Sequence, residues 1–311
     1  MGVVRVIGSI YGHVLAEAGH DVTHLVRPDR VSRLSDGVQL RLLDARADSG
    51  REICVTYRPS LVQVLEPDRP YDLILASVRH YQVPDLLPVL AGGAGSADVV
   101  FFNNLWTSLE PVDRFIRGRY AWAFPVAGGG FENCVLHGAL LSDVQLGRPE
   151  GCPAGLADRA SRMFTGCGLR VQLQPDILAW LWVHFAVEAG VIASVMKAGS
   201  VEAFLDGVDR IAESVLAVRD ALAVVRARGV DVQAQPDAQM FAAPEQVVGQ
   251  GIKELYKADH AARRIMERHT GREELTRIYS DVVTTGRELG VAMPALEALG
   301  PFVVAWAADA A

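Results

Sequence analysis

Short apolar runs alternate with helical stretches along the first half of the chain. Continuous apolar runs at 71–78 (YDLILASV) and 98–102 (DVVFF) are typical of parallel strands that are covered on both faces. Residues 21–26 (DVTHLV) are a further candidate strand, and residues 10–18 predict a helix that ends at Gly19. Strands that alternate with helices predict right-handed βαβ units, and therefore an α/β fold with a Rossmann-like doubly wound sheet.

After about residue 155, long helical periods replace the strands, and Gly229 and Gly290 stand where helix C-caps are expected. We therefore predict a Rossmann-like domain over residues 1–160 and an all-helical C-terminal domain over residues 161–311. Because ligands of open α/β sheets bind at the carboxyl ends of the strands, we expect the site in the cleft between the domains. The predicted helices cover residues 153–167, 176–197, 201–228, 244–268, 272–289 and 294–310.

Composition and charge narrow the classes of function. A net charge of -7 and a pI near 5.6 argue against nucleic acid or an anionic membrane as a partner, because both attract basic patches. No apolar run approaches the roughly twenty residues of a membrane span, and the first residues show no secretory pattern. The four cysteines form no CxxC pair, which favours buried thiols over metal ligands or disulfides. These features predict a cytoplasmic protein that binds a small molecule and no metal.

Short motifs spread along the chain resemble those of one enzyme family, the ketopantoate reductases. That family reads GxGxxGSxYG, GHDVT, VKxxQ, QNG and GxELGVxxP. The resemblance implies a Rossmann-like NADP-binding domain and a helical second domain that often forms a homodimer, which the long apolar helices here would support. The matching segments of this chain are GSIYG at 8–12, GHDVT at 19–23, VRHYQV at 78–83, FNN at 102–104, FPVAGGG at 124–130 and GRELGVAMP at 286–294.

The glycine loop of that family is altered in this chain. In GxGxxG the first glycine permits a tight turn, the second lets the backbone approach pyrophosphate, and the third packs the helix on the sheet. Gly8, followed by Ser9, matches the third glycine. Without a gap, Val3 and Arg5 stand at the first two positions and their Cβ atoms obstruct the phosphate. With a deletion, residues 3–7 form the strand and Gly8 opens a shortened loop. Both alignments predict that NADP binding is weakened or lost.

Other cofactor-binding positions of the family keep suitable residues. Arg27 stands where the family's arginine meets the 2′-phosphate of NADP; the alternative is a solvated loop arginine. Arg79 replaces the family's lysine and can hold an anion in a forked geometry, and Gln82 is retained. Asn104 matches the asparagine near the nicotinamide and substrate. The resemblance therefore implies a residual anion site.

In the family, a helical WxKLxxNxxxN stretch supplies a lysine that protonates the nascent alkoxide. By register His184 takes the lysine position, Glu188 the first asparagine and Ile192 the second. His184 and Glu188 are four residues apart and share a helical face, so the carboxylate could hold the imidazole for general acid–base catalysis. A surface pair or a satisfied core histidine is the alternative.

The family's catalytic glutamate, which grips the substrate hydroxyl, falls on Glu274; an ordinary acidic first turn of a helix is the alternative. The family's serine falls near Ala262. Apolar residues at 192 and 262 favour a carbonyl- or carboxylate-bearing substrate that is more apolar than ketopantoate. Trp106, Trp180 and Trp182 add aromatic surface, although tryptophans on amphipathic helices are usually core residues.

Three functions fit this sequence. The first is a repurposed biosynthetic enzyme that uses His184, Glu188, Glu274 and Asn104 for cyclisation, isomerisation or dehydration without hydride transfer. The second is an NADPH-dependent reductase of a 2-oxo acid or related carbonyl other than ketopantoate, in which His184 donates the proton. The third is a non-catalytic protein derived from the family.

Overall fold

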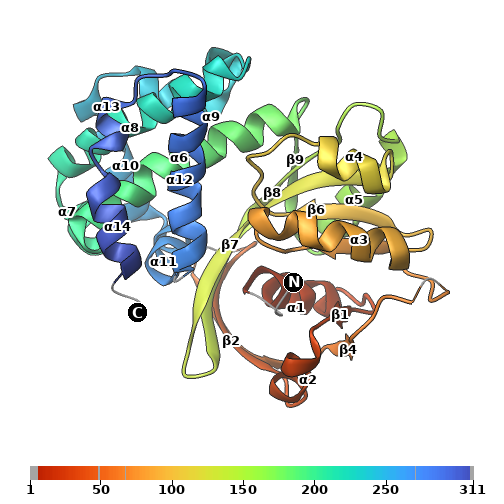
Figure 1. Ribbon diagram of the computed structural model, residues 1–311. Helices are drawn as coiled ribbons and strands as arrows, with labels where there is room; N and C mark the ends of the chain where they lie inside the picture. The colour runs from red at the N-terminus through yellow and green to blue at the C-terminus, as the bar shows by residue number, and fades with distance from the viewer. Residues whose placement is uncertain (1–5, 48–49, 67, 270, 309–311) are drawn as a thin grey trace. The chain divides into compact units, whose positions relative to one another are not determined.

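The computed structural model describes residues 6–47, 50–66, 68–269 and 271–308 (Figure 1). The chain divides into two compact units, Met1–Ile177 and Leu178–Ala311. The first unit is α/β and the second is helical, which confirms the predicted fold class. The predicted boundary at residue 160 lies inside α5 (Ala154–Gly166). Both α5 and β9 (Arg170–Leu173) belong to the first unit, because β9 pairs in parallel with β8 of its sheet.

A seven-stranded mixed sheet forms the frame of the first unit, in the order β3-β2-β8-β7-β6-β5 with β9 beside β8. Its neighbours β5, β6 and β7 are parallel, and β7 and β8 form a long antiparallel pair. The predicted strand at 98–102 is confirmed residue for residue by β6. The strands are β2 (Val38–Ala45), β3 (Arg51–Tyr57), β5 (Leu73–Ala76), β6 (Asp98–Phe102), β7 (Tyr120–Glu132) and β8 (Val135–Gly147).

Two further strands, β1 (Thr23–Leu25) and β4 (Ser60–Val62), form a separate parallel pair. A doubly wound sheet has the strand order 3-2-1-4-5-6. Here β4 and β1 take places 3 and 2, while β5, β6 and β7 take places 4, 5 and 6. Within the described ranges no strand occupies place 1, between β1 and β5. The sheet is therefore split at its centre.

The chain enters the described structure directly as a helix, α1 (Val6–Glu17). The strand considered for residues 3–7 is wrong at Val6 and Ile7, which are helical; residues 3–5 lie outside the described residues. The predicted helix over 10–18 therefore begins four residues earlier than expected. The structure favours the alignment without a gap, in which the helix starts two residues before Gly8.

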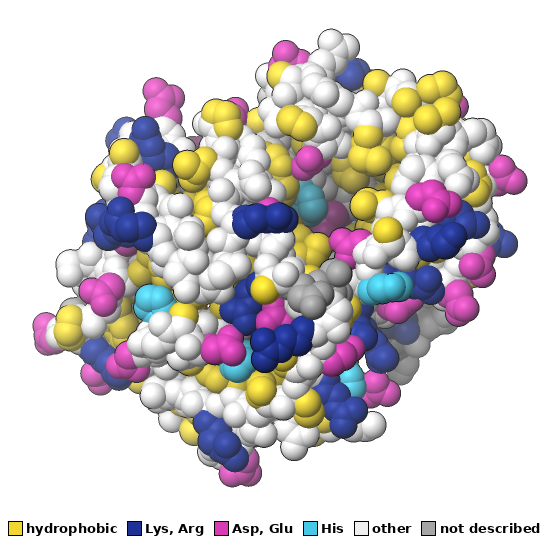
Figure 2. Space-filling view, turned by 180° about the vertical axis from the view of Figure 1, so that it is seen from behind, with side chains coloured by type: hydrophobic (Ala, Val, Ile, Leu, Met, Phe, Trp, Pro, Cys, Tyr) yellow, Lys and Arg dark blue, Asp and Glu magenta, His cyan; other side chains and the backbone are white. Residues whose placement is uncertain are grey.

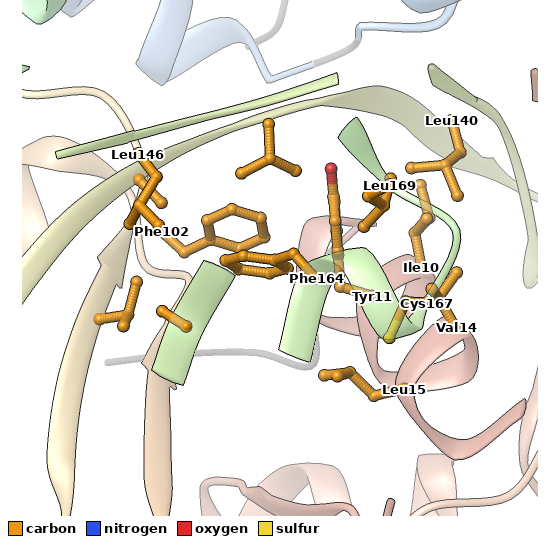
Figure 3. Close-up of a cluster of buried hydrophobic side chains, with 14 of the residues drawn as sticks. Ile10, Tyr11, Val14, Leu15, Phe102, Leu140, Leu146, Phe164, Cys167 and Leu169 are labelled. Carbon is orange, nitrogen blue, oxygen red and sulfur yellow. The ribbon is translucent and has the colours of Figure 1, made fainter. Parts of the chain in front are cut away.

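The core of the first unit forms where α1 and α5 pack on one face of the sheet. Tyr11 of α1 stands edge-on to Phe102 of β6, with ring centroids 4.5 Å apart. Phe102 stacks on Phe164 of α5 at 5.3 Å, as Figure 3 shows. All three side chains are buried, so this aromatic group fixes both helices on the sheet.

The opposite face of the sheet is covered by α3 (Val83–Gly93) and α4 (Glu110–Ile116) (Figure 1). Successive residues of a strand point to opposite faces of the sheet, so Phe101 of β6 lies on the face opposite to Phe102. There it stacks on Trp122 of β7, with ring centroids 4.4 Å apart. Trp122 donates its indole N–H to the Asn103 carbonyl at 2.9 Å. The sheet is therefore covered on both faces, as its apolar strands predict.

The second unit consists of helices, and three of the predicted long helices are interrupted. The breaks fall at Gly207, whose backbone is extended, at Asp259, which caps the next helix through the Ala262 N–H, and at residues 298–299. The main helices are α6 (Ile177–Ala198), α7 (Val201–Asp206), α8 (Val208–Ala227), α10 (Glu245–Ala258), α11 (His260–Arg268), α12 (Arg272–Glu288), α13 (Pro294–Glu297) and α14 (Gly300–Ala308).

Helix α6 is, by length and composition, apolar enough to cross a membrane, but 61% of its most apolar window is buried inside the protein. That burial is typical of the core helix of a globular unit. On the face in Figure 2, basic and acidic side chains are intermixed and do not gather into a basic patch.

Truncating the aromatic group tests its role in the core. We expect Phe164→Ala to lower the free energy of unfolding by about 3–5 kcal/mol, because it leaves a cavity between α5 and the sheet. Urea unfolding followed by near-UV circular dichroism measures the loss. The matched control is Phe115→Ala on α4, whose side chain is 46% exposed and whose removal should cost less than about 1 kcal/mol. Equal losses in the two variants would contradict this account of the core.

Candidate functional site

A cavity of about 900 Å³ lies in the first unit, at the split in the sheet. Strands β1 and β5 both line it, together with residues that follow β4. One wall comes from α1, through Ile7, Tyr11 and Leu15, and another from α3, through Leu86 and Leu90. The cavity is therefore enclosed by apolar helices on both sides and by backbone edges between them.

Gly8 and Gly12 let α1 approach the rest of the unit closely. A Cβ atom on Gly8 would lie 3.1 Å from the Ser77 hydroxyl. A Cβ atom on Gly12 would lie 2.5 Å from His24 Nε2 and 2.6 Å from the Tyr57 hydroxyl. Gly8 therefore keeps the packing role of the third glycine in GxGxxG, and Gly12 makes room for a buried polar pair.

That polar pair consists of His24 and Tyr57, which are joined by a hydrogen bond of 2.8 Å between Nε2 and the hydroxyl. Burial lowers the pKa of His24 to about 4 and raises the pKa of Tyr57 above its ordinary value. Both groups are consequently neutral near pH 7, and His24 lines the cavity as an uncharged hydrogen-bonding group.

Of the residues predicted to bind cofactor, Gly8 and Arg27 line the same cavity. Arg27 follows β1 and pairs with Asp29, its Nε 3.6 Å from the carboxylate, with 38% of its side chain exposed. Ser9, in contrast, is fully buried and cannot touch a ligand directly.

Arg79 and Gln82 share a short 3₁₀ turn beyond β5. The Gln82 side chain accepts the Arg79 backbone N–H at 3.3 Å, and the Arg79 guanidinium donates to the Tyr81 hydroxyl at 2.7 Å. Asn104 is buried, and its neighbour Asn103 donates to the Val78 carbonyl at 2.8 Å. Neither Arg79 nor Gln82 lines the cavity that Gly8 and Arg27 share.

In the second unit, α6 brings together His184 and Glu188. His184 Nε2 lies 3.5 Å from a Glu188 carboxylate oxygen, and about a quarter of each side chain is exposed. The imidazole stacks on the Trp180 ring at 5.0 Å with an interplanar angle of 11°. A carboxylate and an aromatic face both stabilise an imidazolium, so this pair can accept and return a proton.

Two more groups of the second unit bear on this helix. The Arg228 guanidinium lies 3.3 Å from the centre of the Trp182 ring, and burial lowers the pKa of Arg228 to about 10. Tyr256 of α10 has its pKa raised by burial first and then by the charge of Glu188. The Glu188 carboxylate is therefore close enough to Tyr256 for its charge to raise the pKa of that hydroxyl.

Glu274 lies in the first turn of α12 and pairs with His269, whose Nε2 is 3.5 Å from its carboxylate. The second unit thus contains two histidine–carboxylate pairs. Among the residues that the structure describes, no group of three or more His, Cys, Asp and Glu side chains could hold a metal ion.

Comparison with known proteins identifies the first part of the chain. Residues 6–133 match the sequence profile of the family described as Ketopantoate reductase PanE/ApbA. These residues belong to the ketopantoate reductase family. Curated proteins give no match to the sequence.

Solved ketopantoate reductases have the fold of the whole chain. The 2-dehydropantoate 2-reductase of Geobacter metallireducens GS-15 superposes with a TM-score of 0.71 at 16% identity, covering 96% of this chain and 95% of that one. A dimeric ketopantoate reductase from Staphylococcus aureus gives 0.62 at 15% identity, covering 97% and 96%. A D-mandelate dehydrogenase solved with NADH gives 0.69 at 14% identity, covering 98% and 97%. These likenesses establish the fold.

Of the positions that bind the dinucleotide in ketopantoate reductases, Gly8 and Arg27 line the cavity. A doubly wound sheet presents its glycine loop from the strand at place 1, and the described ranges hold no strand there. Gly8 keeps only the helix-packing role, and the positions of the other two glycines, Val3 and Arg5, lie outside the described residues. Arg27 is one of three arginines that line the cavity, with Arg69 and Arg159.

The sequence did not predict the buried pair of His24 and Tyr57. It also did not predict that His269 pairs with Glu274 or that Tyr256 is affected by the charge of Glu188. His24 and Tyr57 are 33 residues apart, and only the glycine at position 12 hints at a close approach. His269 lies five residues before Glu274, so its spacing is a usable signal. The interaction of Tyr256 with Glu188 depends on helix packing, which no local pattern encodes.

The pH dependence of stability tests the buried state of His24. An unfolded histidine, with a pKa near 6.5, takes up a proton before the folded one, with a pKa of about 4. Its contribution is therefore present above pH 6.5 and is lost as the pH falls from about 6.5 to 4. Between pH 7 and pH 5 we expect the wild type to lose about 1–2 kcal/mol more than His24→Gln. Urea unfolding at both pH values measures this, and parallel losses would show that His24 is solvated.

Proposed function

We propose that the chain is a ketopantoate-reductase-like enzyme that performs acid–base chemistry on a small carbonyl- or carboxylate-bearing substrate, without hydride transfer. His184 is the group that takes and returns the proton, and Glu188 stabilises its charged form. The observation that carries this proposal is the 3.5 Å pair between these side chains on α6, at the register of the family's catalytic lysine.

The chemistry follows from what a histidine–carboxylate pair can do. A neutral imidazole removes a proton from the carbon beside a carbonyl, which leaves an enolate. The imidazolium that results is stabilised by the Glu188 carboxylate and by the face of Trp180. Return of that proton at a different atom gives isomerisation. Its transfer to a hydroxyl on the next carbon, which then leaves as water while the enolate electrons form the double bond, gives dehydration.

Three observations support this reaction class over reduction by a nicotinamide cofactor. In the alignment without a gap, Val3 and Arg5 replace the first two glycines of the family's loop, and a Cβ atom at either position obstructs the close approach of pyrophosphate. The family's lysine is replaced by His184. The asparagine positions hold Glu188 and Ile192, so one gains a charge and the other becomes apolar. The last change suits a substrate that is more apolar than ketopantoate.

Deuterium exchange tests the proposal without knowledge of the natural product. We expect the protein to exchange deuterium from D₂O into the carbon beside the carbonyl of at least one member of a panel of 2-oxo acids, followed by NMR. His184→Gln should slow the exchange by about 10²–10⁴-fold, the usual contribution of a positioned acid or base. Glu188→Gln should shift the pH profile as well as the rate.

His260→Gln is the matched control, because this histidine is exposed at the start of α11. It should leave the exchange rate unchanged. Exchange that survives in His184→Gln, or NADPH-dependent reduction of any of these acids, would overturn the proposed function.

A second candidate is an NADPH-dependent reductase of a 2-oxo acid, in which His184 donates the proton. The observation that favours it is Arg27 at the cavity, at the register where the family meets the 2′-phosphate of NADP. A D-mandelate dehydrogenase of the same fold was solved with NADH, which supports nicotinamide chemistry in this fold.

Titration of NADPH and NADH, followed by their fluorescence, tests this candidate. If it holds, NADPH binds saturably, and Arg27→Ala weakens NADPH about tenfold while NADH is unaffected, because only NADPH carries the 2′-phosphate. Arg30→Ala is the control, since Arg30 pairs with the same Asp29 but does not line the cavity. No fluorescence change at millimolar NADPH would exclude the reductase.

A further inference from the structure

Between Val183 and Met196, helix α6 is accessible along one face only. The residues on its other faces are all buried over this range, whereas one row of six residues is partly exposed. The members of this row recur three or four residues apart, which places them on one face of the helix. This open face begins at His184 and runs toward the end of α6. It consists of His184, Val187, Glu188, Val191, Ile192 and Val195.

The two ends of the open face differ in chemistry. The end nearer the start of α6 carries the imidazole of His184 and the carboxylate of Glu188. Beyond Glu188 the face is formed by Val191, Ile192 and Val195, which make an aliphatic stripe. Side chains branched at Cβ are stiff in a helix, so this stripe is a preformed apolar surface. The open face therefore joins a reactive polar end to an apolar surface.

A ligand bound at the reactive end can extend along α6 in one direction only. Toward the start of the helix, the same face is closed by Trp180, which is buried and stacks on the imidazole at 5.0 Å. Toward the end of the helix, the aliphatic stripe is partly exposed as far as Val195. The helix ends at Ala198, and Gly199 follows with a φ of 83°. The apolar surface therefore has a definite direction and a definite end.

The length of the aliphatic stripe sets the length of the chain that it can cover. Val195 lies seven residues after Glu188, which corresponds to about 10.5 Å along a helix axis. An extended alkyl chain advances about 1.25 Å per bond, because C–C bonds of about 1.5 Å meet at about 111°. A chain of about eight carbons therefore spans the distance from the carboxylate to the last valine.

We propose that the substrate is a 2-oxo acid or related carbonyl compound with a straight apolar chain of about eight carbons, which lies along the aliphatic stripe. Its carbonyl end lies at His184, so this inference rests on the proton transfer of the proposed function. Val191 and Val195 determine specificity, because each methylene group that they cover leaves water. A charge at the far end of the chain is disfavoured, since valine and isoleucine side chains offer it no partner.

Calorimetric titration of the full chain with straight-chain 2-oxo acids tests the proposal. The series runs from 2-oxobutanoate to 2-oxododecanoate in steps of one methylene group. Each step should tighten binding about two- to fourfold, the range between half and full burial of the added group, as far as 2-oxodecanoate. The longer acids should gain nothing further, because their last carbons pass the end of the stripe into water.

One variant and a matched control locate the chain on α6. Val195→Asp places a carboxylate, which must stay hydrated, at the end of the stripe. It should weaken 2-oxodecanoate about tenfold, the loss of two or three covered methylene groups, and leave 2-oxobutanoate unchanged. The control is Val304→Asp on α14, at a valine that is 70% exposed, and it should leave both acids unchanged. Circular dichroism checks that each variant is folded, and the chain-length series on the wild type tests the proposal without them.

Three results would overturn the proposal. One is the absence of saturable binding of any of these acids at millimolar concentration. Another is binding of 2-oxodecanoate that is no tighter than that of 2-oxobutanoate. The third is chain-dependent binding that a folded Val195→Asp variant leaves unchanged, which would place the chain elsewhere.

Deuterium exchange, measured on the same acids, separates this inference from the proposed function. Binding that depends on chain length and on Val195, but without exchange of any acid, supports the place of the chain on α6 and contradicts the proposed function. Exchange with equal binding of all the acids contradicts this inference and leaves the proposed function intact.

Discussion

The packing of α1 against the sheet is the interaction on which the rest of the first unit depends. Tyr11 packs edge-on against Phe102, and Phe102 stacks on Phe164, so one aromatic group holds α1, β6 and α5 together. The same close approach places Gly12 over the hydrogen bond between His24 and Tyr57. It also makes α1 one wall of the cavity. Within the described ranges, these contacts join α1 to the sheet, and no central strand precedes it there.

The second unit concentrates its charged chemistry on histidine–carboxylate pairs. In His184 with Glu188 and in His269 with Glu274, the imidazole Nε2 lies 3.5 Å from a carboxylate oxygen. Ketopantoate reductases use a lysine at the register of His184, and a lysine is a permanent cation near pH 7. Under the proposed function, a histidine at this position acts both as proton acceptor and as proton donor.

The sequence predicted the fold because its strongest signals are global. The continuous apolar run at β6 reflects a strand that is buried on both faces. The helical periods after residue 155 reflect helices that are buried on one face. The split of the sheet was harder to predict, because Val3–Ile7 is as apolar as a strand and only the start of α1 at Val6 decides the matter. The breaks at Gly207 and Asp259 were missed because apolar periodicity continues across them. The pair His184–Glu188 was predictable from its spacing of four, whereas the effect of the Glu188 charge on Tyr256 was not.

Because the sheet is split, two parts of the first unit are expected to differ in local stability: the small β1–β4 pair and the larger sheet. The pair of β1 and β4 has three residues in each strand and joins no larger sheet, whereas β6 and β7 are paired on both edges. Hydrogen-bonded amides of such a small ribbon open by local fluctuations, while those of the central strands exchange only through larger unfolding events. Arg27 lies two residues beyond β1, so one of the arginines that line the cavity is attached to this small ribbon. Any ligand that orders this ribbon must supply the free energy for that ordering from its own contacts.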